Sequence, residues 1–484
     1  MTTSISDEAA HTLVLGAGPA GLTAAYQLSR AGVSPVVVLE KEKVAGGYLR
    51  SIRHGEFIMD VGRKELYSRI PEVDGLWKEL LGSDYRPYPH RFGVLYNGEI
   101  IEFSSAYRGF RRGMTWPLFL SCGVDLLWSW AKHGRSPPLT YEEYWYRMCG
   151  RRFSRIFAQG FWEKFRGIRW SAMPPPEQLK GADLGVIPTV GRMLNFGFSK
   201  QGSRPDWRHP AKGSGQICEL LEREVRKSGG YFRFNAQVTE LAVSGRCISA
   251  VICQVGPERL IYRPAHVVAS LPIEFLGQLL FEPARLGMDK ADARQGDARR
   301  STILVYLFLD EEPRFPHAWL EVTDPTLKAG RITNYAAFNT DMVPKGKTCL
   351  CVEFFCYASD DLFGLGVDEL VKLALDECAR SNLIEPNGCF DHFLLKLAGA
   401  DASTSWREWQ DEARSRLLTE IQGFENLYFV NRPGADHASH AGLEAANAIL
   451  CGDRTKFDEL TSPAAQHAAF ATHRRAVDVL RSRL

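Results

Sequence analysis

The amino-acid sequence predicts an α/β fold whose first elements are a strand, a glycine-rich turn, a helix and a second strand. The apolar run HTLVLG is typical of a buried parallel strand, and LTAAYQLSRAG has helical spacing that ends at a glycine. A second short apolar run, PVVVLE, ends at an acidic residue. The chain has 484 residues and 45% hydrophobic composition, so we expect two or three domains.

The turn between the first strand and the helix has the spacing of a dinucleotide-binding site. Gly16, Gly18 and Gly21 form a GxGxxG motif. The first glycine permits a tight turn, the second lets the backbone approach a pyrophosphate, and the third lets helix and strand pack closely. The free N–H groups at the helix N-terminus then face the phosphates. These features together predict a Rossmann-like nucleotide-binding unit.

The acidic residue at the end of the second strand completes this pattern. Glu40 can accept hydrogen bonds from both hydroxyls of a ribose. A glycine turn that serves packing alone is the alternative, but strand, turn, helix, strand and acid all follow in the expected order. The residues that we expect to line the nucleotide here are Gly16, Gly18, Pro19, Ala20, Gly21, Glu40 and Lys41.

Composition and charge exclude several classes of function. Lys and Arg number 59 against 57 Asp and Glu, so no global basic field is present to hold nucleic acid. Eleven cysteines occur without a CxxC pair or a metal-ligand spacing, which predicts reduced thiols and no metal site. The N-terminal stretch MTTSISDEAAH lacks the basic and apolar regions of an export signal, so we expect a cytoplasmic location.

The longest apolar stretch is too short for a transmembrane helix. It is WPLFLSCGVDLLWSWA, from Trp116 to Ala131, and Asp125 interrupts it. A span needs roughly 20 apolar residues, so no integral membrane segment is expected. Two interpretations remain for this helix: one packed on a core, which the sequence favours, and one that rests on a membrane surface.

The glycine turn does not separate NAD from FAD, but the segment that follows does. GGYLRSIRHGEFIMDVG contains a Gly-Gly pair, an Arg-Ser pair and an Asp-x-Gly. This resembles the flavoprotein superfamily of amine oxidases, protoporphyrinogen oxidases, phytoene desaturases and UDP-galactopyranose mutases. The resemblance implies that Gly47 and Arg50 lie along the FAD pyrophosphate, where a guanidinium can neutralise two phosphates. We expect non-covalent FAD, because no cysteine or histidine lies in a recognisable attachment motif.

The resemblance extends in order along most of the chain. The helical segment that ends in EKFRG, the strand HVVASLP, the stretch AGRITNY and the final ENLYFVNRPGADHASHAG each look like family segments. They imply a GR2-type FAD-binding domain made of residues 1–90, 206–285 and 418–468, a helical insert at 91–205, and a sheet-containing substrate domain at 286–417. The further cofactor contacts implied are Gly47, Tyr48, Arg50, Gly62, Val238, Ser270, Asn431, Asp436, His437 and Ala438.

Two candidate catalytic residues follow the Asp-x-Gly. Oxidases and mutases of this superfamily commonly have a second glycine there, whereas this chain has Arg63 and Lys64. Cations near N1 and C2=O of the flavin stabilise its anionic reduced form, which favours acceptance of a hydride. The alternative is that both side chains point to solvent or to a phosphate, since charged side chains are usually exposed.

Two more candidates come from distant parts of the chain. Arg331 matches an arginine that binds the substrate's phosphates in UDP-galactopyranose mutases. His437 can act as a general base or as a local hydrogen-bonding group, and His440 is a weaker candidate of the same kind. We expect Lys64, Arg331 and His437 to converge around the flavin ring.

The reaction itself stays open between three hypotheses. The segment from Arg432 to Asp436 lacks the loop that carries a second phosphate-binding arginine in the mutases. The sequence therefore favours an oxidoreductase that transfers a hydride to flavin N5 from a polar small metabolite, whether an amine, an alcohol or a sugar derivative. A non-redox, mutase-like enzyme acting on a nucleotide sugar and a flavin-binding scaffold without turnover are the alternatives.

Overall fold

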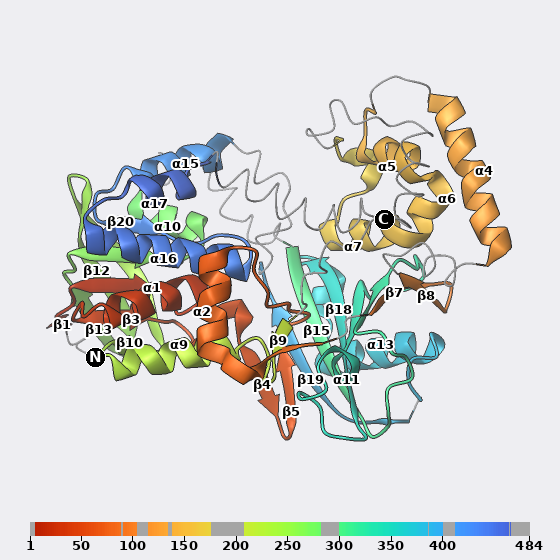
Figure 1. Cartoon of the computed structure of the whole chain (residues 1–484), viewed down its shortest axis with the longest axis horizontal. Helices are drawn as coiled ribbons and strands as arrows, with labels where there is room; N and C mark the ends of the chain where they lie inside the picture. The colour runs from red at the N-terminus through yellow and green to blue at the C-terminus, as the bar shows by residue number, and fades with distance from the viewer. Residues whose placement is uncertain are drawn as a thin grey trace. The chain divides into compact units, whose positions relative to one another are not determined.

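The computed structural model describes residues 5–88, 91–103, 115–133, 138–175, 208–281, 300–385, 387–399, 412–463 and 465. The fold is mixed α/β, as the sequence predicts, and the chain divides into two compact units (Figure 1). The first unit consists of residues 1–87, 207–294 and 406–474, and the second of residues 88–206, 295–405 and 475–484.

A parallel sheet forms the centre of the first unit. Its strand order is β10-β3-β2-β14-β20, and every neighbouring pair is parallel. The strands are β2 (Thr12–Leu15), β3 (Val36–Leu39), β10 (Tyr231–Arg233), β14 (His266–Ala269) and β20 (Leu427–Phe429). All residues of β2 and β3 are buried, because both faces of this sheet are covered.

Helices cover one face of this sheet and a second sheet covers the other. Alternate side chains divide accordingly: Val14 packs with the helices, whereas Leu13 and Leu15 pack with the second sheet. The helices are α1 (Pro19–Arg30), α2 (Pro71–Leu81), α9 (Gln216–Lys227), α16 (Ala435–Cys451) and α17 (Thr455–Thr461). The second sheet has the order β1-β13-β12-β11, from β1 (Ile5–Glu8), β11 (Ala236–Ser244), β12 (Cys247–Val255) and β13 (Glu258–Tyr262), with α10 (Ile273–Leu280) and α15 (Glu412–Gln422) beside it.

Short hairpins and turns link these layers. They are the 3-10 turns at Gly47–Leu49 and Gly82–Asp84, the pair β4 (Ser51–His54) and β5 (Phe57–Asp60), and the pair β6 (Tyr85–Pro87) and β9 (Arg208–Pro210). The hairpin of β4 and β5 follows directly from the segment with the Gly-Gly pair. It therefore connects the nucleotide turn to the rest of the unit.

Helix α16 approaches the backbone of α1 closely at a glycine, and α1 in turn approaches the nucleotide turn at another. A Cβ placed on Gly442 of α16 would lie only 2.2 Å from the carbonyl oxygen of Ala20 in α1. A Cβ on Gly21 would lie 2.1 Å from the carbonyl oxygen of Gly16. Since real atoms never approach so closely, both positions require glycine, and the first turn of α1 is held between the nucleotide turn and α16.

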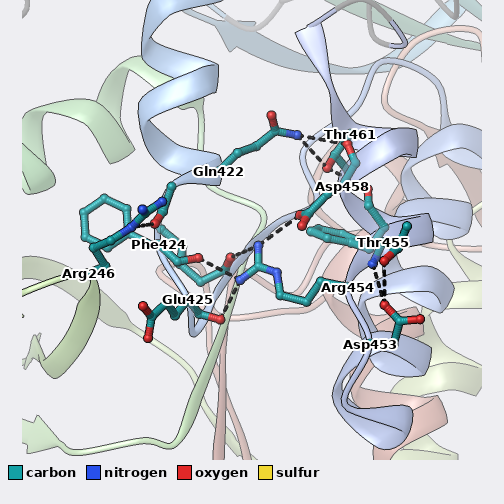
Figure 2. A network of polar contacts seen from close by, with 12 residues as sticks. Arg246, Gln422, Phe424, Glu425, Asp453, Arg454, Thr455, Asp458 and Thr461 are labelled. Atoms are coloured by element: carbon teal, nitrogen blue, oxygen red, sulfur yellow. Dashed lines mark hydrogen bonds and ion pairs between the residues drawn. The ribbon is translucent and has the colours of Figure 1, made fainter.

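A network of polar contacts around Arg454 holds the loop that leads into β20 (Figure 2). The Arg454 guanidinium donates to the carbonyl oxygens of Phe424 at 2.7 Å and Glu425 at 2.6 Å, and pairs with Asp458 of α17 at 3.1 Å. Arg246 donates to the carbonyl oxygen of Gly423 at 2.6 Å. These bonds anchor the loop before β20, so the strand that leads into α16 has a defined position.

The second unit is built on a sheet with the strand order β19-β15-β18-β17-β16-β7-β8. Its strands are β7 (Phe92–Tyr96), β8 (Glu99–Phe103), β15 (Arg300–Leu309), β16 (Trp319–Val322), β17 (Arg331–Asn334), β18 (Thr348–Tyr357) and β19 (Cys389–Leu397). Helix α13 (Val367–Arg380) packs on one face, and α11 (Tyr335–Phe338) and α12 (Asp361–Gly364) are short. Strands β7 and β8 lie in the segment expected to be a helical insert, and both belong to this sheet.

A helical group completes the second unit. It contains α4 (Trp116–His133), α5 (Tyr141–Cys149), α6 (Arg151–Ser154), a π-helical turn at Arg155–Gln159, α7 (Gly160–Arg166) and a 3-10 turn at Trp170–Ala172. Trp145, Trp162 and Trp170 are buried in one cluster, and the Trp145 and Trp170 rings stack 5.4 Å apart. These aromatic side chains therefore form the core of the group. Within the described ranges, no helix combines the length and the apolar character needed to cross a membrane.

Replacement of Gly442 by valine should destabilise the first unit, because the new side chain collides with the backbone of α1. Overpacking of this kind costs about 1–3 kcal/mol, so we expect a clearly lower unfolding midpoint in thermal or denaturant titration. Gly75→Ala is the matched control: Gly75 is an exposed glycine of α2, and a Cβ added there would meet no atom within 4 Å. That control should be neutral or stabilising by up to about 1 kcal/mol. Equal midpoints for Gly442→Val and wild type would contradict the close approach.

Candidate active site

The nucleotide turn leaves open space in front of α1. Gly16 has φ +100°, and a Cβ there would lie 2.4 Å from Oγ of Ser270, which donates to the carbonyl oxygen of Leu15 at 3.0 Å. A Cβ on Gly18, by contrast, would meet no atom within 4 Å. Gly18 is the N-cap of α1, its position has no capping side chain, and Pro19 is the first helical residue. The N-terminal backbone amides of α1 therefore face a space that suits a phosphate.

The Gly-Gly pair lies directly against this turn. Gly46 donates its N–H to the carbonyl oxygen of Ala17 at 2.7 Å, and a Cβ on Gly47 would be 3.5 Å from Cα of Gly18. Both glycines have positive φ, +110° and +54°. The half-buried Arg50 donates from Nη1 to the carbonyl oxygen of Gly47 at 2.9 Å, while Tyr48 is exposed. The two motifs thus border one space, and contact of Gly47 and Arg50 with the pyrophosphate stays a prediction.

The carboxylate of Glu40 is oriented by two backbone N–H groups. Oε2 accepts from Ala17 at 2.7 Å, and Oε1 accepts from Glu42 at 2.9 Å. Glu40 is buried, and each of its carboxylate oxygens keeps a further lone pair for a ligand hydroxyl. Lys41 is exposed, with Nζ 3.9 Å from the Glu42 carboxylate. The geometry of Glu40 is therefore compatible with the expected role as ribose acceptor.

The start of β11 is attached to the end of β3. Ala236 donates its N–H to the carbonyl oxygen of Glu40 at 2.9 Å, and Asn235 donates to that of Glu42 at 3.1 Å. Val238 is buried two residues further on, and the pairing of β11 with β12 shifts register directly after it. Val238 thus lies in the second sheet, two residues beyond the point where β11 is bonded to the end of β3. Its expected contact with adenine stays a prediction.

A buried network that the sequence did not predict supports the Gly-Gly segment. The Asp60 carboxylate accepts from Ser51 Oγ at 2.7 Å and from the Ser214 N–H at 2.8 Å, and its Oδ2 lies 3.0 Å from Nε2 of His209. Asp60 and His209 are completely buried. The Gly215 N–H donates to Ser51 Oγ at 2.8 Å. The start of α9 is thereby attached to β4 and β5.

The loop after β5 carries the two predicted cations. Gly62 has φ +69°, Lys64 is half-buried, and Arg63 forms an ion pair with the nearby Glu65. The charge of Arg63 is therefore balanced by a carboxylate. The pKa of Tyr67 in the same loop is raised, mainly by burial and secondly by the negative charge of Glu65.

The same loop reaches the N-terminus of α16. Ser68 Oγ lies 3.5 Å from Oδ2 of Asp436, and Oδ1 of Asp436 accepts the His437 N–H at 2.9 Å. Ala438 is buried and His437 is half-buried. Asn431 donates from Nδ2 to the carbonyl oxygen of Leu271 at 2.9 Å and so joins the ends of β14 and β20. The structure thus brings Asp436 and His437 close to the loop of Arg63 and Lys64, within one unit.

His440 and Arg432 have local partners. Burial lowers the pKa of His440, whose Nε2 lies 3.7 Å from Glu444 one helical turn away. Arg432 is buried and donates to the carbonyl oxygens of Leu460 in the last turn of α17 and of Ala465 beyond its end. Burial lowers the pKa of Arg432 to about 10. The position of the Arg432 side chain was not predicted from the sequence.

In the second unit, Arg331 is paired with Glu353. Nη1 of Arg331 lies 2.9 Å from Oε2 of Glu353, its direct cross-strand neighbour on β18. The guanidinium also lies over two aromatic rings, 5.3 Å from the centroid of Phe161 and 5.6 Å from that of Phe355. Arg331 and Lys64 belong to different units, so their expected convergence around the flavin stays a prediction.

The EKxxG segment of α7 is a structural anchor. Nζ of Lys164 donates to the carbonyl oxygens of Val322, Asp324 and Ala329 at 2.7–3.1 Å, and burial lowers the pKa of Lys164 to about 8. Oε1 of Glu163 accepts the Trp170 N–H at 2.9 Å. A pocket of about 330 Å³ lies beside this segment and is lined in part by Lys164, Arg169, Arg300, Phe355, Tyr357 and Asp360. Phe355 is the ring that also contacts Arg331, so the pocket is adjacent to that ion pair.

Across the described residues, no group of three or more His, Cys, Asp or Glu side chains is placed to hold a metal ion. The groups that converge in the first unit are instead backbone amides, glycines, one oriented carboxylate and an arginine. Such a set suits a dinucleotide with an anionic pyrophosphate and a ribose.

Comparison with known proteins agrees with this arrangement. The family model for flavin-containing amine oxidoreductases matches residues 19–450. Reduced UDP-galactopyranose mutase has a similar structure, with a TM-score of 0.75 and 18% identity over 95% of this chain and 97% of that chain. A protein from Exiguobacterium sp. 255-15, provisionally named a protoporphyrinogen oxidase, gives 0.66 and 15% over 93% and 100%. Putrescine oxidase bound to putrescine gives 0.56 and 13% over 92% and 100%.

At 13–18% identity, the solved structures establish only that the fold is shared. The family model matches most of the chain and therefore establishes the family. Comparison with curated proteins gave no significant match. The chain belongs to the flavin-containing amine oxidoreductase family, and FAD is its cofactor.

Substitutions of Gly18 and of Gly21 should have different effects, the first on FAD affinity and the second on the stability of the apoprotein. Gly18→Ala places a methyl group in the open space before α1, so the apoprotein should keep its unfolding midpoint. FAD affinity should fall at least about tenfold, the equivalent of one hydrogen bond to a charged group. Gly21→Ala should instead lower the midpoint of the apoprotein, since its Cβ meets the Gly16 carbonyl oxygen.

The measurements are fluorescence titration of apoprotein with FAD and denaturant unfolding of the same samples. Unchanged FAD affinity in Gly18→Ala would show that the space before α1 does not receive the pyrophosphate.

Proposed function

We propose that this protein is an FAD-dependent oxidoreductase that removes a hydride from a polar small metabolite such as an amine, an alcohol or a sugar derivative. The observation that carries the proposal is the open space before Gly18, bordered by the N-terminal amides of α1, by Gly47 and by the segment of Arg50. The family match supports the redox class of the reaction. The first unit would act as a Rossmann-like, GR2-type cofactor domain, and the second would supply most of the substrate site.

The residues of the first unit have distinct proposed roles. Glu40 accepts the ribose hydroxyls, Arg50 and the α1 amides neutralise the pyrophosphate, and Val238 borders the adenine. The N-terminal amides of α16 provide positive potential at the flavin end, where Asp436 and His437 begin the helix. When bound, FAD supplies the acceptor for the hydride. We expect it to be held without a covalent bond and to be released when the protein is denatured.

His437 is the proposed general base. It is half-buried at the start of α16, next to an acidic residue and close to the loop of Lys64. A neutral imidazole in such a place can take a proton from a substrate O–H or N–H. Lys64 is the proposed cation that favours the reduced cofactor, because its loop reaches the N-terminus of α16 through Ser68 and Asp436.

Two arginines bear on the choice between oxidation and mutase chemistry. A mutase must hold a nucleotide diphosphate while the sugar is detached, which requires phosphate-binding cations that are free to act. Arg331 is balanced by Glu353, and Arg432 donates to carbonyl groups in the last turn of α17 and just after it. Both observations support oxidation. The TM-score of 0.75 to UDP-galactopyranose mutase is the observation that keeps the mutase-like reaction as the second candidate.

Anaerobic mixing of the holoprotein with candidate substrates tests the reaction class. Aliphatic amines, amino sugars and nucleotide sugars are the panel that follows from the proposal. We expect one of them to remove the oxidised-flavin absorbance as product forms, because the cofactor takes up the hydride. Turnover of UDP-galactopyranose by prereduced protein without net oxidation would support the mutase-like alternative. Absence of both responses would support a scaffold.

The role of His437 can be tested with the substrate that such a screen identifies. His437→Ala should slow flavin reduction by about 100-fold or more, since a positioned general base contributes about 10²–10⁴. His440→Ala is the matched control, because His440 is directed to Glu444 and should have little effect. FAD content is measured in both variants. Equal rates of flavin reduction in His437→Ala and His440→Ala would show that His437 is not the general base.

A further inference from the structure

One face of α4 is apolar and exposed along its full length. Trp116, Leu120, Val124, Leu127 and Trp128 expose 58%, 61%, 68%, 54% and 54% of their surfaces. Their spacing of four, four, three and one residues places them on one side of a helix. Gly123 and Ala131 are exposed on the same side, so that side carries no charged residue between Trp116 and Trp128. A surface helix of a globular protein usually exposes charged and polar residues on the side that faces away from the core.

The other face of α4 is attached to the protein. Cys122, Leu126 and Ser129 are buried, and α4 packs on α5 and α6 within its unit (Figure 1). The charged residue in the middle of the helix, Asp125, points to this side and accepts the Arg152 N–H at 2.7 Å. The sequence favoured a helix packed on a core, and this is correct for one face only. The polar contacts are turned inward and the apolar stripe is turned outward.

Exposed basic residues lie at the end of α4 and on the turns that pack against its covered face. Lys132 is exposed at the end of α4, and its Nζ lies 5.1 Å from the ring centroid of Trp128. Arg151, Arg152 and Arg155 are exposed on the adjoining turns. The charge of this region is therefore complementary to an anionic surface.

We propose that α4 binds in the plane of an anionic phospholipid membrane surface, with its apolar stripe in the acyl boundary and with Lys132 and the exposed arginines of the adjoining turns facing the headgroups. A helix with this combination of apolar side chains, terminal tryptophans and flanking cations binds at lipid interfaces. Indole rings suit the headgroup region because they are apolar with one N–H donor. This function is additional to the proposed oxidation and does not depend on it.

The stripe is less suited to a protein partner or to a second copy of the chain. Protein interfaces carry about one hydrogen bond per 100–200 Å². Between Trp116 and Trp128, the large exposed side chains of α4 are Leu120, Val124 and Leu127, which offer no donor or acceptor. An acyl layer needs no such groups.

Vesicle cosedimentation of the holoprotein tests the proposal. The wild type should sediment with vesicles of phosphatidylcholine containing phosphatidylglycerol, less with pure phosphatidylcholine, and less at high salt. The triple variant Leu120→Glu/Val124→Glu/Leu127→Glu should bind at least about tenfold more weakly, and the corresponding triple serine variant should also bind weakly without added charge. Val243→Glu/Val367→Glu/Phe390→Glu adds the same charge at exposed apolar residues elsewhere and should bind like the wild type.

Flavin content and circular dichroism establish that each variant is folded. Equal sedimentation of the wild type and a folded α4 triple variant would overturn the proposal. The proposal would also be overturned if the wild type bound neither kind of vesicle but formed a dimer, and the α4 variants were monomeric. The stripe would then cover a second copy of the chain.

Discussion

The structure of the first unit depends on bringing the N-terminus of one helix to a ligand while its remaining sides stay packed. The first turn of α1 contacts the backbone of the nucleotide turn at Gly21 and the backbone of α16 at Gly442, and neither contact leaves room for a Cβ. Gly18 is different, because its missing side chain faces empty space. Packing therefore explains two of these glycines, and ligand access explains the third.

Side chains bonded to distant backbone groups hold the loops around that helix. Glu40 and Asp60 are buried carboxylates that accept from backbone N–H groups. Arg454 and Lys164 do the reverse, donating to carbonyl oxygens of loops far along the chain. Buried charges are costly unless they are bonded, and loop backbone needs partners where it leaves a sheet. Each of these side chains satisfies both requirements at once.

Three arginines considered for the site are likewise bonded to groups within the protein. Arg63 and Arg331 have carboxylate partners, and Arg432 is bonded to carbonyl groups. Their charges are thus already engaged within the protein. The apolar stripe of α4 has the opposite character, since it presents unsatisfied apolar surface to the outside. The two units consequently offer different surfaces: an amide-lined space for a cofactor in one, and an apolar helix face in the other.

The amino-acid sequence by itself determined the α/β fold, the family and the cofactor. Those conclusions rest on residues close together in the chain, such as Gly16, Gly18 and Gly21, whose spacing alone specifies a turn. The Asp60–Ser214 bond, the Arg331–Glu353 pair and the anchor of Lys164 join residues from 22 to 165 positions apart. Only the tertiary structure could decide these partners, because they depend on strand order and register. It also decided which face of α4 is covered, since a helix that is apolar on nearly all sides carries no sequence signal for its exposed face.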